Sequence, residues 1–256
     1  MTVENPSSLP IWPIGWTVIH VAETGSTNDD LLAAAQAGAA DQTVIVADFQ
    51  TAGKGRLDRS WEATRGTNLL VSLLFRYGDR EPSRYTRIVA LAARAACQTV
   101  ADVQPGIKWP NDLVVGGHKL AGLLAVGAPR ERFVVVGIGV NVGWAPSGAT
   151  SLVAAAGGAR SVALNVSPLV LLGEMLREID RRAAGDDAVL HAEHKAALVT
   201  LGARVRVELR AGGAGAGDDI VGVAVDLDEL SRLIVRDDAG TSHVIEVGDV
   251  VHLRAH

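Results

Sequence analysis

The stretch that organises this chain reads Lys108-Trp109-Pro110-Asn111-Asp112, then a short apolar run, then Lys119-Leu120-Ala121-Gly122-Leu123-Leu124. Apolar, strand-like segments flank the pair Gly116-Gly117. Two glycines between apolar runs predict a two-residue hairpin, because both central residues of such a turn need a positive φ. The hairpin folds residues 108–112 back towards Lys119. A folding core does not need this cluster of cations, amide and carboxylate, whereas chemistry on an anionic substrate does.

The composition is that of an ordered protein with room for one large domain and a small one. The chain has 256 residues, 48% of them hydrophobic and 21% charged, with no apolar run of the roughly 18 residues that span a bilayer. The first thirteen residues lack the pattern of a signal peptide. A single cysteine, Cys97, excludes an internal disulfide framework and fits the cytoplasm. We therefore expect a cytoplasmic protein without membrane contact, and its net charge of −5 argues against bulk nucleic-acid binding.

Lysine is rare in this chain, and its placement is informative. Only four of the 24 Lys and Arg residues are lysine, and three of them (Lys54, Lys108 and Lys119) fall in the glycine-punctuated segments 50–66 and 108–122. Lysine is a compact point charge that grips one oxyanion, whereas arginine is a planar fork. This clustering hints at sites that need a point charge.

Hydrophobic periodicity predicts alternating strands and helices up to residue 201. Apolar and β-branched runs predict strands at 16–22, 43–49, 68–75 and 133–140, and helical spacing predicts helices at 31–37, 85–101, 168–184 and 188–201. Several short strands after Gly202 predict a small β-barrel, with the glycine-rich stretch 212–217 as a flexible hairpin loop. We therefore expect an α+β fold in two domains, at residues 1–201 and 202–256.

Two segments ahead of the central stretch have both a structural and a functional interpretation. Ser26, Thr27 and Asn28 form a plain helix cap or, with the free N–H groups of a helix N-terminus, a site for an anion or a carbonyl. The segment 50–61 has two glycines, three cations and a tryptophan after a strand, so it is a mobile solvated loop or an anion-binding nest. Its spacing matches neither a P-loop nor a dinucleotide fingerprint.

Other candidate groups are weaker. Gly137 and Gly139 lie within a strand, which indicates that another element or a ligand presses on the backbone. His191 and His194 lie three residues apart, but no further ligand-rich cluster supports a metal site, and a solvated helix face explains them better. Cys97 is expected to be a small buried hydrophobe rather than a nucleophile.

These motifs resemble those of the biotin protein ligases, and of the actinobacterial members in particular. The resemblance rests on Lys108–Asp112 paired with Lys119-Leu120-Ala121-Gly122, preceded by Gly25-Ser26-Thr27-Asn28 and by Gln50-Thr51-Ala52-Gly53-Lys54-Gly55-Arg56. It implies a mixed sheet flanked by helices, like class II synthetases, and a C-terminal SH3-like barrel. The chain is similar to the short form without an N-terminal DNA-binding domain, because the first strand begins after about fifteen residues.

The resemblance also implies an activity. The carboxylate of biotin attacks the α-phosphate of ATP to give biotinoyl-5′-AMP, and a lysine of the biotin carboxyl carrier domain of an acyl-CoA carboxylase then takes the biotinoyl group. The implied biotin-binding residues are Ser26, Thr27, Asn28, Gln50, Lys54, Gly55, Arg56, Lys119, Gly122 and Gly137. The implied ATP-binding residues are Arg56, Arg59, Trp61, Asn111, Lys119 and Asn141. No nucleic-acid partner is expected, and the chain is expected to be a monomer or a weak homodimer.

We expect Lys119, Arg56 and Asp112 to carry the chemistry. Two anions must meet, so fixed cations and a Mg²⁺ ion brought by ATP have to offset their repulsion. Asp112 is the nearest carboxylate for that metal. It could instead accept the proton of the incoming lysine, whose ordinary pKa is about 10.4, or simply cap the turn after Asn111.

The loop at 53–61 departs from the family pattern Gly-Arg-Gly-Arg-x-Gly-Arg-x-Trp. Lys54 replaces the first arginine, and Asp58 stands where the pattern has its last glycine. We expect a looser or differently ordered loop, with a higher apparent constant for ATP. A lipoate ligase or octanoyl transferase would share the fold, and a non-catalytic biotin sensor would share the pocket. The tryptophan-bearing motif argues against the first, and the full set of charged residues argues against the second.

Overall fold

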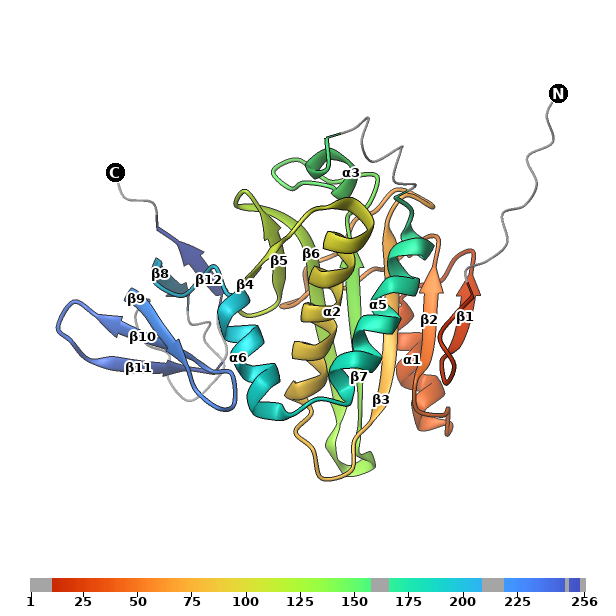
Figure 1. Ribbon diagram of the computed structural model, residues 1–256, viewed down its shortest axis with the longest axis horizontal. Helices are drawn as coiled ribbons and strands as arrows, with labels where there is room; N and C mark the ends of the chain where they lie inside the picture. Colours follow the sequence, from red (N-terminus) through yellow and green to blue (C-terminus); the bar gives the residue numbers. More distant parts are fainter. Residues whose placement is uncertain (1–10, 158–165, 209–218, 247–248, 254–256) are drawn as a thin grey trace.

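The protein is built on a seven-stranded sheet with helices on both faces (Figure 1). This computed structural model describes residues 11–157, 166–208, 219–246 and 249–253. The strands lie in the order β1-β2-β3-β7-β6-β5-β4. Their bounds are β1 Thr17–Val21, β2 Thr43–Ala47, β3 Leu69–Arg76, β4 Gly106–Lys108, β5 Asp112–Val115, β6 His118–Ala128 and β7 Phe133–Val140.

The sheet is mixed, as predicted. Strand β1 pairs with β2 in parallel across the helix α1 (Thr27–Gln36), and every other neighbouring pair is antiparallel. The middle strands β3 and β7 are buried along almost their whole length. This explains why their sequences read as continuous apolar runs rather than as an alternation.

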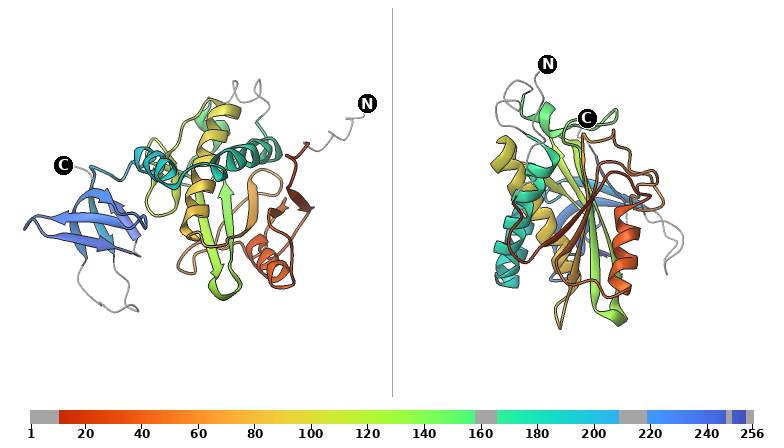
Figure 2. Two further views of the ribbon diagram at one scale, coloured as in Figure 1. Left: turned by 60° about the horizontal axis from the view of Figure 1, so that its bottom comes forward. Right: turned by 90° about the vertical axis from the view of Figure 1, so that its right-hand side faces the viewer.

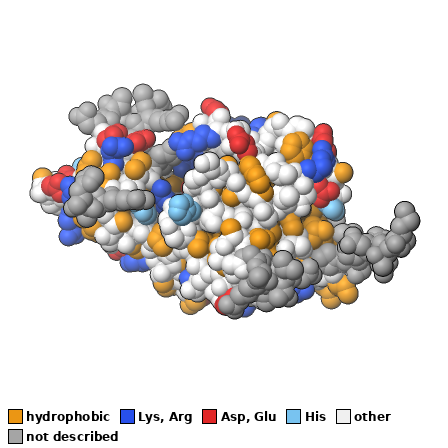
Figure 3. Space-filling view, turned by 90° about the horizontal axis from the view of Figure 1, so that it is seen from above, with side chains coloured by type: hydrophobic (Ala, Val, Ile, Leu, Met, Phe, Trp, Pro, Cys, Tyr) orange, Lys and Arg blue, Asp and Glu red, His pale blue; other side chains and the backbone are white. Residues whose placement is uncertain are grey.

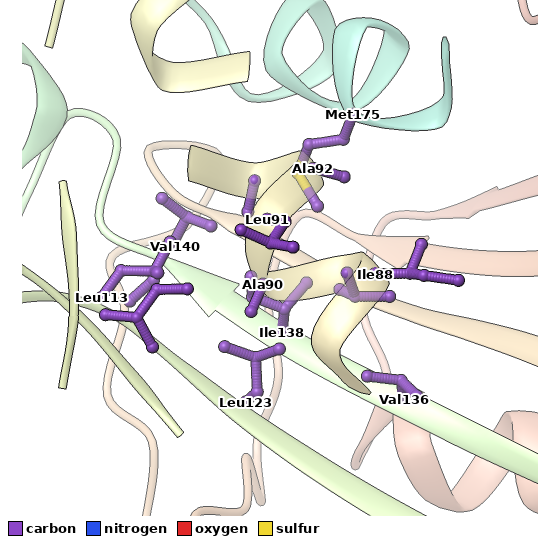
Figure 4. Close-up of a cluster of buried hydrophobic side chains, with 14 of the residues drawn as sticks. Ile88, Ala90, Leu91, Ala92, Leu113, Leu123, Val136, Ile138, Val140 and Met175 are labelled. Carbon is purple, nitrogen blue, oxygen red and sulfur yellow. The ribbon is translucent and has the colours of Figure 1, made fainter. Parts of the chain in front are cut away.

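The helices form two layers, one on each side of the sheet (Figure 2). α2 (Ser83–Ala101) and α5 (Pro168–Ala183) cover one face, and α1 covers the other. Figure 4 shows the core between the first pair and the sheet, where Ile88 and Leu91 of α2 meet Met175 of α5 and Ile138 of β7. Cys97 lies in this core with no exposed surface, and burial raises the pKa of its thiol to about 12. It is therefore a buried hydrophobe, as expected.

The predicted glycine hairpin is present between β5 and β6. Gly116 and Gly117 have φ of 57° and 81°, and Val115 pairs with His118 across the turn. The register then opposes Asp112 to Gly122, and β4 opposes Lys108 to Asp112. The three strands thus bring residues 108–112 beside 119–124, as the sequence indicates.

Helix ends differ from the prediction in two informative places. α1 begins at Thr27, four residues earlier than its apolar spacing indicates, because Ser26 takes the extended N-cap conformation. α6 (Asp187–Ala197) ends before residue 201, since Leu198 is extended and bridges in parallel to Ile107 of β4. None of the helices that the structure describes combines the length and the apolar character that crossing a bilayer requires.

A second, antiparallel sheet follows, in the order β11-β10-β9-β8-β12. Its strands are β8 Arg204–Glu208, β9 Ile220–Leu227, β10 Leu233–Asp237, β11 Ser242–Ile245 and β12 Asp249–His252. It packs beside α6 and β4 (Figure 1) and is consistent with the small SH3-like domain expected here. The glycine-rich stretch 212–217 lies outside the described residues. Between α3 (Leu152–Ala155) and α5, residues 158–165 are likewise not described.

Candidate functional site

The candidate site lies on the face of the sheet that α1 covers, over the middle of β3, β6 and β7. A pocket there is walled by the first turn of α1, by the loop 50–61 and by the three strands. All ten residues predicted to bind biotin line it: Ser26, Thr27, Asn28, Gln50, Lys54, Gly55, Arg56, Lys119, Gly122 and Gly137.

Hydrogen bonds fix the polar end of this pocket. The backbone N–H and the hydroxyl of Thr27 donate to Oε1 of Gln50, at 2.7 and 3.0 Å. The amide of Asn28 donates to the carbonyl of Leu124 at 3.1 Å, and its Oδ1 accepts from the hydroxyl of Ser72 at 2.6 Å. The amide orientation of Asn28 follows from these two contacts. The Ser26 side chain makes no capping bond, and the N–H of Thr27 is already bonded to Gln50. The use of this helix N-terminus as a site for an anion or a carbonyl stays a prediction.

The glycines of β6 and β7 make room for side chains from other elements. A Cβ at Gly137 would lie 2.2 Å from Oδ1 of Asn28, and one at Gly139 would lie 2.4 Å from the indole of Trp61. At Gly122 it would meet both Trp61 and Nζ of Lys119, at 3.0 and 3.1 Å. Of the two explanations left open for Gly137 and Gly139, the structure supports another element rather than a ligand.

The cationic side of the site centres on Lys119. Its Nζ lies 2.7 Å from Oδ1 of Asp112 and 5.5 Å from the ring centre of Trp61. Asn111 holds the neighbouring backbone, because its Nδ2 donates to the carbonyl of Leu123 at 2.7 Å while its own carbonyl accepts from the N–H of Leu123 at 2.9 Å. Arg56 donates to Oδ1 of Asn111 at 3.3 Å. The two halves of the site, on the loop and on the hairpin, therefore touch each other.

Two further pockets adjoin the first and share Lys119 and Trp61 with it. One reaches towards the C-terminal sheet and is lined by Arg56, Arg59, Asn111 and Asp112. The other runs under residues 146–149 and is lined by Asn141. Every residue predicted to bind ATP lines at least one of the three pockets: Arg56, Arg59, Trp61, Asn111, Lys119 and Asn141.

Trp61 and Asn141 differ in what their polar atoms do. The indole N–H of Trp61 is buried without a hydrogen-bond partner, so it is free to donate to a ligand. The amide of Asn141 already donates to the carbonyl of Thr150 at 3.2 Å, and its Oδ1 lies 3.5 Å from Nδ2 of Asn68. Asn141 therefore shapes the pocket wall through the loop that it holds.

The loop 50–61 is a compact hairpin. The N–H of Gly55 donates to the carbonyl of Arg59 at 2.7 Å, and the N–H of Trp61 donates to that of Gly53 at 2.9 Å. Lys54 forms an ion pair with Asp29 of α1 at 2.6 Å. Leu57 and Asp58 both have positive φ, of 57° and 58°. The looser loop expected from the sequence stays a prediction, and the positive φ of Asp58 is the backbone feature through which it can be tested.

The protein side chains at the site could bind a metal ion only together with the phosphates of a nucleotide. Among the described residues there is no group of three or more His, Cys, Asp or Glu side chains that could hold an ion. Asp112 offers one carboxylate at the pocket, whose Oδ1 pairs with Lys119 without a well-aligned hydrogen bond. One protein carboxylate suits Mg²⁺ that is otherwise held by phosphates and water. His191 and His194 belong to no such group. The expected solvated helix face is wrong for His194, which is 5% exposed, and its burial lowers the pKa to about 4.

Two contributors to the site were missed by sequence reasoning. Ser72 lies in a run of leucines and valines, where a lone serine reads as a tolerated core residue, yet its hydroxyl supports both Thr27 and Asn28. Asp29 reads as an ordinary acid in the first turn of a helix, yet it pairs with Lys54. Both signals depend on segments far apart in sequence.

Comparisons with known proteins agree with this geometry. The biotin/lipoate A/B protein ligase family matches residues 21–142. The biotin–[acetyl-CoA-carboxylase] ligase of Mycobacterium tuberculosis is 39% identical over 94% of this chain and 91% of its own length. A bifunctional ligase/repressor, BirA, of Bacillus subtilis is 35% identical, over 56% of this chain and 48% of its own.

Solved structures show the same fold. The biotin protein ligase of Aquifex aeolicus in complex with biotin and ATP superimposes with a TM-score of 0.72, at 23% identity, over 93% of this chain and 99% of that one. That of Leishmania major in complex with biotinyl-5-AMP gives 0.61 at 22% identity, over 90% and 98%.

Proposed function

The chain belongs to the biotin/lipoate A/B protein ligase family, and from that premise we propose that it is an ATP-dependent biotin–protein ligase. It forms biotinoyl-5′-AMP from biotin and ATP and transfers the biotinoyl group to a lysine of a biotin carboxyl carrier domain. The observation that carries this function is the row of three adjoining pockets that meet at Lys119 and Trp61. Such a row can hold one ligand on each side of a single fixed cation.

The first pocket suits biotin. A ureido ring needs both donors and acceptors, and the hydroxyls and amides of Thr27, Asn28, Gln50 and Ser72 are held in fixed orientations by one another. Beyond them the pocket is lined by apolar residues of β6 and β7, Leu123, Leu124 and Ile138, which suit an aliphatic chain. We assign the biotin carboxylate to the end of the pocket where Lys119 and Arg56 lie.

In the first step a carboxylate oxygen of biotin attacks the α-phosphorus of ATP and pyrophosphate leaves. Lys119 and Arg56 offset the charge of the two approaching anions, and a site of this kind acts because its cations are already in place. Trp61 lies over the same point, and its unpartnered N–H is available to the nucleotide. Bound Mg²⁺ would supply further charge neutralisation at the phosphates, with Asp112 as the protein carboxylate nearest to it.

In the second step the amine of the carrier lysine attacks the biotinoyl carbonyl and AMP leaves. The ammonium group must first lose a proton, since its ordinary pKa is about 10.4. We assign this proton to Asp112, which lines the pocket on the side of the site that faces the C-terminal sheet. A role as metal ligand would act in the first step, and a role as proton acceptor would act in the second.

The partner we propose is the biotin carboxyl carrier domain of an acyl-CoA carboxylase, in keeping with the name of the Mycobacterium relative. We place the boundary between the catalytic and C-terminal domains at residues 201 and 202, propose a cytoplasmic monomer or weak homodimer, and expect no nucleic-acid partner. On the face shown in Figure 3, basic and acidic side chains are interspersed rather than gathered into one basic patch, which supports the last expectation.

The test is biotin-dependent exchange between ATP and pyrophosphate, measured with and without a carrier domain. We expect exchange with biotin, none with lipoate or octanoate, and a mass increase of one biotinoyl group on the carrier lysine. Exchange that requires lipoate instead would reassign the substrate. Exchange without any transfer to a carrier would reduce the protein to an adenylate-forming sensor.

A further inference from the structure

The tryptophan in the middle of the central stretch points away from the site and into the C-terminal sheet. Trp109 is only 4% exposed. Its indole N–H donates to the carbonyl of Ser231 at 3.0 Å, across 122 residues of sequence. Its backbone N–H donates to the hydroxyl of Thr200 at 2.9 Å. A second group of the C-terminal sheet, Nε2 of His252, lies 3.3 Å from that same hydroxyl.

The turn between β9 and β10, residues 228–232, is built to present Ser231. Its Asp228 carboxylate accepts from the backbone N–H groups of Leu230 and Arg232, at 3.0 and 2.9 Å, and from the Arg232 guanidinium at 2.6 Å. Ser231 has a φ of 63°, a conformation that costs an ordinary residue about 1–2 kcal/mol. The backbone bonds to Asp228 on either side of Ser231 hold the turn in this conformation.

A catalytic-domain helix holds the same serine from a second side. Arg87 of α2 is 7% exposed, and its guanidinium donates to the Ser231 hydroxyl at 2.7 Å. Ser231 therefore offers its carbonyl to Trp109 and its hydroxyl to Arg87. The tip of the turn is fixed between two parts of the catalytic layer.

The contact lies two and three residues from groups of the site. β4 and β5 oppose Lys108 to Asp112, so Trp109, Pro110 and Asn111 form the connection between those two strands. Asn111 is fixed to Leu123 by two hydrogen bonds, and Asp112 meets Lys119. Because only two or three residues separate them, a displacement of Trp109 also displaces Asn111 and Asp112.

We propose that Trp109 is a positioning residue, through which the Ser231 turn sets the place of Asn111 and Asp112 opposite Lys119. This inference rests on the proposed ligase function. An interdomain contact that served only stability would have no reason to fall within the segment that carries two site residues. The C-terminal sheet is thereby part of the structure that orders the nucleotide side, and Trp109 itself lies outside the lining of the biotin pocket.

The experiment compares Trp109→Phe with the wild type. Phenylalanine keeps an aromatic ring but removes the indole N–H, so the Ser231 carbonyl loses this hydrogen bond. Adenylation kcat, normalised to the number of active sites by the biotinoyl-AMP burst, is expected to fall about ten-fold, whereas the Kd for biotin stays within two-fold. Ser231→Ala, which removes only the Arg87 contact, is expected to lower kcat about three-fold, and the double variant no further than Trp109→Phe alone.

Trp16→Phe is the matched control. Trp16 is also buried, and its indole N–H donates to Asp180 at 2.9 Å, far from the site. Its replacement should lower the melting temperature but leave kcat per active site unchanged. If Trp109→Phe and Ser231→Ala behave like Trp16→Phe, Trp109 is a stability contact and the inference is wrong.

A readout without turnover separates this inference from the ligase function. The N–H of Leu123 donates to Asn111, so its hydrogen exchange should accelerate in Trp109→Phe and Ser231→Ala but not in Trp16→Phe. Unchanged exchange in both variants would overturn the inference, even for a protein without ligase activity. Loss of biotin-dependent exchange of pyrophosphate in the wild type would instead overturn the function.

Discussion

At the residue scale, Gly137 tests whether the biotin pocket depends on one close approach. Gly137→Ala would place a Cβ 2.2 Å from Oδ1 of Asn28, so the amide has to leave its bonds to Ser72 and Leu124. We expect the Kd for biotin to rise ten-fold or more, measured by titration calorimetry. Gly127→Ala, on β6, is the control, because the nearest atom to its Cβ would be 3.9 Å away. Equal affinities in the two variants would contradict the assignment of the pocket.

Lys119 is the residue on which the proposed chemistry depends most. Lys119→Met keeps the length of the side chain and removes its charge. Loss of one fixed charge-stabilising group typically costs a factor of about 10²–10³ in rate, and we expect a loss of that size in the adenylation rate. Lys195→Met, which breaks the ion pair with Asp226 outside the three pockets, should leave the rate unchanged. A Lys119→Met enzyme that forms adenylate at the normal rate would refute the proposed role.

Asp112 has two proposed roles that can be measured separately. If it holds Mg²⁺, Asp112→Asn should slow adenylation, and raised Mg²⁺ should restore part of the rate. If it accepts the lysine proton, the same change should slow transfer from preformed biotinoyl-AMP, and raised pH should restore part of that rate. Asp79→Asn, which affects an exposed pair with Arg132, is the control. Unchanged rates in both steps would remove Asp112 from the mechanism.

At the scale of elements, the hairpin at 53–61 carries strain that a substitution can relieve. Asp58 has a positive φ. Glycine adopts this conformation without a steric cost, whereas aspartate adopts it at a cost in free energy. We expect Asp58→Gly to favour the ordered loop and to slow release of biotinoyl-AMP several-fold in stopped-flow measurements. Asp58→Asn removes the charge but tolerates the same backbone. If Asp58→Asn slows release as much as Asp58→Gly does, the charge of Asp58 rather than backbone strain is responsible. If neither variant changes the release rate, the order of the loop does not depend on this position.

The elements that local patterns encode were predictable, and their contacts were not. Gly116 and Gly117 specify the β5–β6 turn on their own, and the apolar runs of β3 and β7 could be assigned without tertiary information. Ser72 could not be placed in the site, because its role exists only once β3 lies under α1. The early start of α1 escaped prediction for a related reason. Thr27 and Asn28 are polar and do not extend the apolar spacing of the helix, and bonds to the distant residues Gln50 and Leu124 fix them.

At the scale of the whole molecule, the junction of the two sheets was the part least accessible from sequence. Trp109 belongs to the most distinctive motif of the chain, so reasoning from the motif assigned its neighbours to the site. The structure directs its ring towards Ser231, at a separation in sequence that no periodicity spans. The same junction buries Arg87 and His194, which both line the crevice between α2 and residues 230–231.

His194 gives that region a defined response to acid. Burial, followed by the nearby charges of Arg87 and His191, lowers its pKa from 6.5 to about 4. In the unfolded chain the His194 imidazole therefore binds a proton below about pH 6.5, whereas in the folded protein it binds one only near pH 4. The stability that this contributes is complete above pH 6.5 and is lost as the pH falls towards 4, by at most about 3 kcal/mol.

The measurement is the free energy of unfolding in urea between pH 4.5 and 7.5, for the wild type and His194→Gln. We expect the variant to be less stable at pH 7.5 but to lose less stability on acidification, with a slope smaller by up to one proton. Ala192→Gly, at an exposed position inside the same helix, should lower stability by about 1 kcal/mol at every pH, because it changes no titrating group. If His194→Gln keeps the wild-type slope, the proton is taken up elsewhere, and acid stability does not depend on the junction between the two sheets.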